Sequence, residues 1–412
     1  MLAPPPPPVR KVPCRPEREK AEKDDAMQGS GYSNWICEEL QLESGRKVRT
    51  YWWPACSAAV GQQRTAILCL HGAGDVGLVW APVASLLVAD GRLPGTTVVA
   101  ADLRGHGLDE DDSDLCISRL VSDALELVET VSTRLGPGTG VVLAGHSLGG
   151  SVAARAAAEG LSRRPPLPVR AALLLDTVEG TALEGLTRTA AWLRARPHTF
   201  RSPAEAVRWA LAVGMLQNER VARLTVPARL RQLPAIAGRP GGEPGSSQQP
   251  GAADVSSDSV ASVGSVGPWC WRAKVSEAEQ HWRGWFEGLS QIFTALPLPK
   301  LLVVGGVDRL DGPLEAAHMQ GRFKLSVVPH SGHQLHEDRP EEVAEAFAAF
   351  LSGLQRQQAA FVRLQAEAGP ATALSPPSVV AAGLKRNREH RGAESSDSLC
   401  RENRSVQSLA EK

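Results

Sequence analysis

The sequence predicts an α/β fold in which helices cover both faces of a mostly parallel, doubly wound sheet. Short apolar runs typical of buried strands occur at 64–70, 96–101, 141–144 and 169–175, and segments with helical spacing separate them. Strands that alternate with helices favour parallel pairing, because each helix carries the chain back to where the next strand starts. The alternating stretch 36–53 predicts an opening hairpin of strands.

The same patterns predict the remaining elements. Apolar residues at helical spacing indicate helices at 78–89 and 117–135 and a closing helix over 343–354. Two short apolar runs, 301–304 and 323–328, predict the last strands.

A helical cap is expected to interrupt the sheet domain over about 180–236 and 269–296. Residues 181–235 show helical patterning without strand signals, and 269–293 is helical and aromatic in pattern. Between these parts, 237–268 is rich in Gly, Pro and Ser and nearly lacks large apolar side chains. It predicts a low-complexity loop within the fold, because core-type sequence resumes after it.

One domain with two tails accounts for the length of 412 residues, since the hydrophobic content of 42% is enough for a sizeable core. The folded domain is expected to span 31–356. Residues 1–30 are Pro-rich and basic and are expected to be disordered. Residues 357–412 are expected to begin as helix and then to become disordered.

Composition narrows the class of protein. The formal net charge is zero, so nothing global indicates a nucleic-acid or membrane-surface partner. Seven cysteines are scattered singly, without a C-x-x-C pair, which argues against a disulfide framework and a zinc site. No apolar run of about twenty residues and no signal-type start occur. We expect a reducing compartment, the cytoplasm, with the nucleus as a second location.

The fold is organised around the stretch VVLAGHSLGGSVAAR at 141–155. A strand-type run precedes the G-x-S-x-G pattern Gly145–Gly149, and an alanine-rich helical segment follows it. This context predicts the nucleophile elbow of an α/β-hydrolase fold, with Ser147 as nucleophile. Gly145 and Gly149 fit the elbow because a β-carbon would crowd so tight a turn. A surface glycine turn is the alternative for the pentapeptide taken alone.

A serine hydroxyl needs a base, and the base needs an orienting acid. His333, in the loop before the closing helix, is the candidate base, with His330 and His336 as rivals on spacing alone. Two aspartates lie at strand ends in the required order. Asp308 follows the penultimate strand and Asp176 follows the strand after the elbow helix, so the residues leave both open.

An oxyanion hole needs two backbone donors. Leu148 N–H follows the nucleophile directly, and Ala73 N–H lies in the segment HGAG after the first buried strand. Gly72 and Gly74 would let this backbone approach the substrate. We expect His71 to brace the loop and the segment DLRGHG at 102–107 to be structural.

Two features of the cap could serve recognition. Trp269, Trp271, Trp282 and Trp285 could wall a peptide groove or pack on the core. The stretch 180–240 holds three acids and ten arginines, which would favour an acidic partner or form a solvated helix face. These arginines are Arg188, Arg194, Arg196, Arg201, Arg208, Arg220, Arg223, Arg229, Arg231 and Arg239.

Over roughly 31–353, without the 237–268 loop, the chain resembles the protein phosphatase methylesterase family. The segments that carry the resemblance are, in order, HGAG, DLRGHG, GHSLGG, LLLDTVEGTALEGL, RPHTF, HWRGWFEGLS, LPKLLVVGGVDRLD, MQGRF and SGHQLHED. Several of them, such as DTVEGTAL and WRGWFEGLS, are not general features of α/β-hydrolases.

The resemblance implies a serine hydrolase that removes the methyl ester from the C-terminal leucine of the protein phosphatase 2A catalytic subunit. It implies Asp176 as the triad acid, with Ser147 and His333, and a supporting role for Asp308. It implies no metal and no organic cofactor, and the phosphatase subunit as partner. A general small-molecule carboxylesterase or thioesterase, or a non-catalytic scaffold that binds the phosphatase, are the alternatives.

Overall fold

The computed structural model describes Tyr32 and the ranges 35–55, 64–89, 92–109, 114–234 and 267–368. The expected tails, 1–30 and the polar end of 357–412, lie outside the described residues. All but the last two residues of the expected loop 237–268 also lie outside the described residues.

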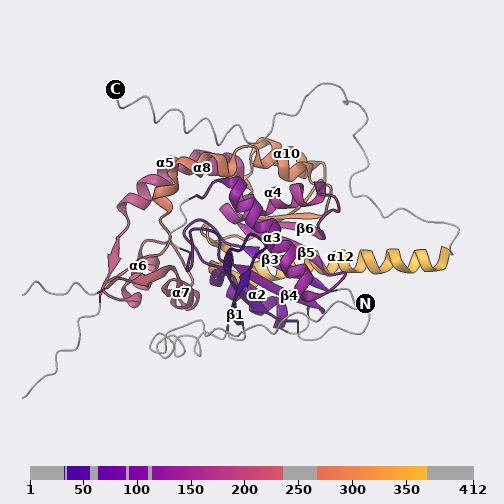
Figure 1. The fold of residues 1–412 in the computed structure, drawn as a ribbon. Helices are drawn as coiled ribbons and strands as arrows, with labels where there is room; N and C mark the ends of the chain where they lie inside the picture. Colours follow the sequence, from indigo (N-terminus) through magenta and orange to yellow (C-terminus); the bar gives the residue numbers. More distant parts are fainter. Residues whose placement is uncertain are drawn as a thin grey trace, which may run out of the picture. The chain divides into compact units, whose positions relative to one another are not determined.

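The central sheet has eight strands in the order β1-β2-β4-β3-β5-β6-β10-β11 (Figure 1). β1 and β2 form the predicted antiparallel hairpin, β2 also pairs antiparallel with β4, and all later neighbours are parallel. The strand bounds are β1 (Ile36–Gln41), β2 (Lys47–Trp53), β3 (Thr65–Leu70), β4 (Thr96–Ala101), β5 (Gly140–His146), β6 (Val169–Leu175), β10 (Lys300–Val304) and β11 (Lys324–Val327).

Apolar side chains fill both faces of this sheet. Successive residues of β3 point to opposite sides, so Leu68 belongs to one apolar cluster and Ile67 to the other. Helices α3 and α4 contribute to the first cluster, and α2 and α12 to the second. Burial on both faces explains why the strands read as continuous apolar runs in the sequence.

The helices of the sheet domain follow the strands in the predicted alternation. α4 begins directly after the elbow serine, and α12 extends beyond the predicted closing helix. The bounds are η1 (Gly77–Trp80), α2 (Ala81–Val88), α3 (Ile117–Leu135), α4 (Leu148–Ser162), η5 (Val307–Arg309), α10 (Gly312–Met319), α11 (Leu335–Asp338) and α12 (Pro340–Ala368).

The cap is mainly helical, as the sequence predicts, but it also contains a small antiparallel sheet, β7-β9-β8. Figure 1 shows α6 and α7 grouped away from the labelled strands of the main sheet. The bounds are α5 (Glu179–Ala195), β7 (Thr199–Phe200), α6 (Pro203–Ala212), α7 (Glu219–Thr225), η3 (Pro227–Arg229), β8 (Leu230–Gln232), β9 (Trp269–Trp271), η4 (Val275–Ala278), α8 (Glu279–Phe286) and α9 (Leu289–Ala295).

Two expectations about the cap are wrong. The stretch 181–235 contains the strands β7 and β8, and 269–271 is a strand instead of the start of a helix. Strands of two or three residues are too short to show a period of two in the sequence. β9 pairs with β7 and β8, which are distant in the chain. The ring of Trp271 also packs edge-on against that of Phe200, with 5.5 Å between the ring centres.

A buried group of charges joins the cap to the sheet domain. Arg229, at the end of η3, is 1% exposed, and its guanidinium donates to Asp75 at 2.8 Å and to both carboxylate oxygens of Glu337. Asp75 lies in the loop after β3 and Glu337 in α11. Next to it, Asp338 accepts bonds from Gln217 N–H of the cap and from Gly332 N–H, both at 2.8 Å.

The two carboxylates that share Arg229 respond differently to burial. Burial is the largest influence and would raise the pKa of Asp75, but Arg229, through its charge and its hydrogen bond, and the neighbouring imidazoles together outweigh burial and lower that pKa to about 2. For Glu337, burial dominates and raises the pKa above its usual value although Arg229 opposes the change. The guanidinium therefore compensates two acids at once, and its removal would leave both without their arginine partner.

We expect Arg229→Met to lower the free energy of unfolding by about 3–5 kcal/mol, because it leaves two buried carboxylates uncompensated. Urea and thermal unfolding measure the loss. Arg223→Met is the matched control, since Arg223 lies in the neighbouring helix and pairs with Glu219 at the surface. The control should change stability by about 0.5 kcal/mol or less. Equal losses in the two variants would contradict the anchoring role of Arg229.

Candidate active site

Ser147 occupies the sharp turn between β5 and α4. Its backbone has φ 52° and ψ −119°, a conformation that non-glycine residues rarely adopt. A β-carbon on Gly145 would overlap the carbonyl of Gly149, and one on Gly149 would overlap the carbonyl of Leu70. The two glycines therefore let β5, α4 and β3 approach closely enough to form the elbow.

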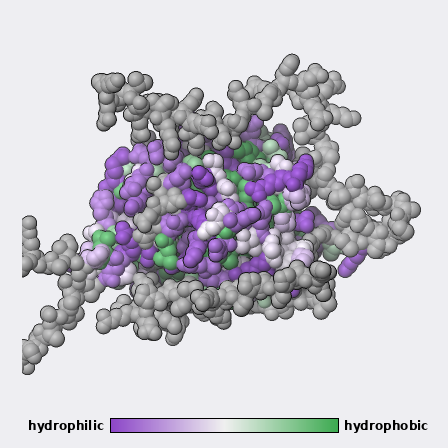
Figure 2. Space-filling view, viewed as in Figure 1, coloured by the Kyte–Doolittle hydropathy of each residue, from purple (hydrophilic) through white to green (hydrophobic). Residues whose placement is uncertain are grey.

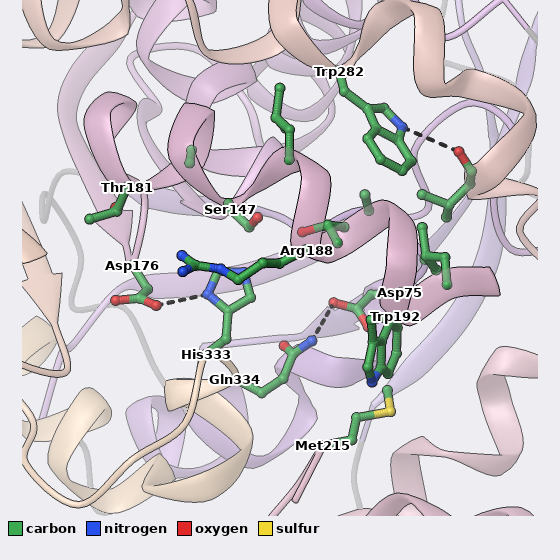
Figure 3. Close-up of a pocket in the computed structure, with 18 of the residues that line it drawn as sticks. Asp75, Ser147, Asp176, Thr181, Arg188, Trp192, Met215, Trp282, His333 and Gln334 are labelled. Carbon is green, nitrogen blue, oxygen red and sulfur yellow. Dashed lines mark hydrogen bonds and ion pairs between the residues drawn. The ribbon is translucent and has the colours of Figure 1, made fainter. Parts of the chain in front are cut away.

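Asp176 and His333 meet behind this serine. Asp176 directly follows β6, and its Oδ2 accepts a hydrogen bond from His333 Nδ1 at 2.7 Å (Figure 3). The Asp176 side chain is 6% exposed, whereas that of His333 is 55% exposed. Both residues and Ser147 line one cavity. The hydrogen bonds among the described residues do not include one between Ser147 and His333, a contact that often tightens only when substrate binds.

Asp308, the competing acid, does not reach His333. It lies exposed in η5, and the residue after it takes the inward position: Arg309 donates to Asp176 Oδ2, the oxygen that also faces His333. Asp311 further along caps α10 and accepts bonds from Gly180 N–H and Ser290 Oγ. Of the segment GVDRLD, the sequence reasoning weighed Asp308 and missed Arg309, although an arginine beside a candidate acid is a readable signal.

The charges around Asp176 keep it ionised. Burial alone would raise its pKa, but the hydrogen bond and charge of His333, together with the charge of Arg309, lower it below the usual value. The carboxylate is thus held negative by two neighbours. An ionised acid in this position orients the imidazole and stabilises the imidazolium that forms during proton transfer.

The loop that carries His333 is fixed on both sides. His146, the residue before the elbow serine, donates from Nε2 to the carbonyl oxygen of His333 at 2.8 Å. Gly332 N–H is bound by Asp338. Of the rival histidines, His330 is exposed and has a positive φ of 57°, and His336 is fully buried between Trp80 and His146. Only His333 of the three contacts the carboxylate of Asp176.

The geometry near the expected oxyanion hole separates its candidate donors. Leu148 is the first residue of α4, so no earlier helical carbonyl uses its N–H. Gly74 N–H already donates to His106 Nε2 at 2.9 Å, which leaves Ala73 as the donor we favour in this loop. Gly72 lies against the ring of His146. A β-carbon at position 72 would come within 2.8 Å of the imidazole Nδ1, so the contact requires glycine.

His71 braces the same loop, as expected. Its Nε2 accepts from Leu103 N–H at 2.9 Å, and its Nδ1 lies 2.8 Å from the carbonyl oxygen of Gly72. Burial, and then the neighbouring His106, lower its pKa to about 3, so the ring is neutral and can make both bonds. Asp102 of the DLRGHG segment accepts from Gly77 N–H at 2.6 Å. These contacts bear out the structural role expected for both segments.

The cavity above the three residues has a volume of about 630 Å³ and mostly apolar walls. Trp282 and Trp285 line it while they are buried in the core, which confirms for these two the interpretation that they pack on the core. Trp271 also lines it from the cap sheet, and Trp269 lies half-buried in the same strand. A pocket of this shape suits an apolar side chain next to the reacting group.

Several arginines of the cap form ion pairs within the chain and do not contribute a free positive charge to its surface. Arg229 is buried, and Arg194, Arg201 and Arg223 pair with acids of the chain. Arg188 and Arg196 line the cavity instead. Figure 2 shows that hydrophilic side chains cover most of the visible described surface.

Among the described residues, no group of three or more His, Cys, Asp or Glu side chains is placed to hold a metal ion. None of the helices described is both long enough and apolar enough to span a bilayer.

Comparison with known proteins matches residues 67–346 to the alpha/beta hydrolase family. Protein phosphatase methylesterase 1 of Mus musculus is 35% identical over 308 residues, which cover 71% of this chain and 76% of the relative. The protein of the same name from Homo sapiens is 34% identical over the same shares of the two chains. A probable protein phosphatase methylesterase 1 of Caenorhabditis elegans is 32% identical over 76% of this chain and 75% of the relative.

Solved structures agree on the fold. E-2-(acetamidomethylene)succinate hydrolase superimposes with a TM-score of 0.58 at 18% identity and covers 77% of this chain and 100% of that one. An esterase of Mycobacterium tuberculosis gives a TM-score of 0.53 at 22% identity, over 81% of this chain and 98% of that one. The family match and the relatives identify a serine carboxylic ester hydrolase. The chain belongs to the protein phosphatase methylesterase family of α/β-hydrolases.

Proposed function

We propose that this enzyme hydrolyses the methyl ester on the C-terminal leucine of a protein phosphatase 2A catalytic subunit. The observation that carries the proposal is the similarity to proteins named protein phosphatase methylesterase 1 over 308 residues. The apolar cavity beside Ser147 supports it, because a leucine side chain next to the ester would be buried there. We propose the cytoplasm and nucleus as the locations of the reaction.

In the proposed mechanism, Ser147 Oγ attacks the ester carbonyl while His333 takes its proton. Asp176 holds the imidazole in the tautomer whose Nδ1–H donates to the carboxylate, and it stabilises the imidazolium. The N–H groups of Leu148 and Ala73 would hold the developing oxyanion, each contributing about 2.7–4 kcal/mol to the transition state. The tetrahedral intermediate then breaks its bond to the methoxy oxygen, and His333 gives its proton to that oxygen, so that methanol leaves.

The second half of the reaction uses the same groups. A water molecule loses a proton to His333 and attacks the acyl-enzyme carbonyl, and the serine leaves with that proton restored. The product is a free carboxylate, which carries a negative charge that the methyl ester lacks. A partner of the phosphatase subunit can therefore distinguish substrate from product by charge alone.

The position of Asp176 explains how Arg309 would act in this mechanism. Arg309 donates to the oxygen that faces His333, so it fixes the carboxylate and offsets part of its charge. Because its contact is with the acid, we treat it as a positioning residue. Asp308 is left with a role in the turn that presents Arg309.

Demethylation of the purified, methylated phosphatase subunit tests the function. The wild-type enzyme should release methanol and free carboxylate, and Ser147→Ala should do neither while it keeps its thermal unfolding midpoint. A fluorophosphonate probe should label the wild type alone, which distinguishes an enzyme from a non-catalytic scaffold. Rapid hydrolysis of small acyl esters with no action on the methylated subunit would instead indicate a general esterase.

Paired substitutions test the choice of acid. Asp176→Asn should lower kcat by about 10⁴-fold, since the amide would favour the wrong imidazole tautomer. Asp308→Asn is the matched control and should remain near the wild-type rate, because Asp308 is exposed and does not contact His333. Steady-state kinetics on a leucine methyl ester peptide provide both values. The opposite ranking would refute Asp176 as the triad acid.

The Arg309–Asp176 pair predicts a change in pH dependence. Arg309 helps to lower the pKa of Asp176, so the carboxylate stays ionised as the pH falls. In Arg309→Gln that pKa should rise, because the carboxylate loses one of its two cationic or hydrogen-bonding partners. Titration of the Asp176 carboxyl carbon, followed by NMR, measures this shift. Arg283→Gln, at a surface pair with Glu287, should leave the pKa of Asp176 unchanged; an unchanged value in Arg309→Gln would contradict the assignment.

A further inference from the structure

One arginine of the cavity wall stands apart from the other charged groups that line it. Arg196 directly follows α5, and its N–H caps that helix by donating to the carbonyl of Trp192 at 3.0 Å. Its guanidinium carbon lies 4.7 Å from the ring centre of Trp271 and 5.8 Å from that of Trp192. Stacking on two indoles restricts the side chain to a defined position in the wall.

The other acids and bases of the cavity are already paired or solvated. Asp75 is bound by Arg229, and Asp176 is bound by Arg309 and His333. Arg188 is exposed, so water solvates it. Arg196 is half-buried, and within the described part of the chain no carboxylate forms an ion pair with it.

The partial burial of Arg196 changes the pKa of its side chain. Burial lowers its pKa to about 10, and no neighbouring acid offsets the change. The side chain is still charged near neutral pH. A half-buried cation without a counter-ion gains free energy when a ligand brings an anion to it.

Because Ser147 and Arg196 line the same cavity, one ligand can reach both. The ester that Ser147 attacks is neutral, so it does not supply the anion. A guanidinium fixed by aromatic stacking presents a planar pair of donors, which matches a carboxylate. Side-chain carboxylates are the anions that an unmodified polypeptide substrate carries.

We propose that Arg196, with Trp271 and Trp192, forms an anion subsite that binds an Asp or Glu side chain of the methylated polypeptide, upstream of the ester. The subsite makes the enzyme select acidic C-terminal segments over neutral ones. This inference rests on the proposed function, since it assumes a polypeptide ester as substrate.

Matched peptides test the subsite. Each ends in leucine methyl ester, and one of the five preceding positions at a time carries either Glu or Gln. At the position that faces Arg196, the wild type should show a kcat/KM about tenfold higher for Glu than for Gln, as expected for one charge-assisted hydrogen bond. Arg196→Gln should reduce that ratio to about one by removing activity on the Glu peptide, and Arg196→Lys should retain part of it.

Arg194→Gln is the matched control, because Arg194 lies two residues earlier, is exposed and pairs with Glu279 at 3.8 Å. It should keep the full preference. A measurement without any variant gives a second check: added salt should reduce the Glu-over-Gln ratio of the wild type, since it screens the ion pair.

Three results would overturn the subsite. Arg196→Gln could lower kcat/KM equally for both peptides, which would mean that Arg196 only supports the cap. The wild type could show no preference at any position, with or without salt. Arg196→Gln could selectively weaken inhibition by the demethylated Gln peptide, which would assign Arg196 to the terminal carboxylate of the product. In each case the wild type still demethylates peptides, whereas failure of the proposed function would abolish turnover of the peptides and the phosphatase subunit alike.

Discussion

The pairing of Arg229 with Asp75 and Glu337 is the interaction on which the arrangement of the site depends. It joins three segments that are distant in sequence: the cap, the loop with the expected oxyanion donor Ala73, and the helix after His333. Buried ion pairs add little net stability, because desolvation offsets most of the attraction. Their value here is geometric, since the guanidinium can bind both carboxylates only while the three segments are in contact.

Hydrogen bonds around this cluster extend the constraint to the reacting groups. His146 precedes the nucleophile and holds the carbonyl of His333, while Asp338 binds the backbone on the other side of that histidine. His333 itself stays more than half exposed, so its ring is positioned through its backbone and through Asp176. The imidazole of His333 is thereby held in one position while it stays accessible to a substrate.

Local patterns were enough for much of the fold: β4, α3 and β6 have the bounds that apolar spacing predicts. They also located Ser147 and His333, because the motif that predicts each of these residues is made of its neighbours in the sequence. The choice between Asp176 and Asp308 was not readable from spacing, because both follow strands and only tertiary geometry orients their side chains. Arg309, Arg229 and the β7-β9-β8 sheet depend on partners far along the chain, and a single sequence does not display such pairings.

The place of Asp176, the proposed triad acid, in the sheet has a structural consequence. β5 and β6 are hydrogen-bonded neighbours, and His146 is paired in register with Leu175, one residue before Ser147 and Asp176 respectively. The backbone separation of Ser147 and Asp176 is therefore set by the pairing of these two strands. The turn after β10 adds no residue to this pairing, so Arg309 acts on the orientation and the electric field of the carboxylate without setting that backbone separation.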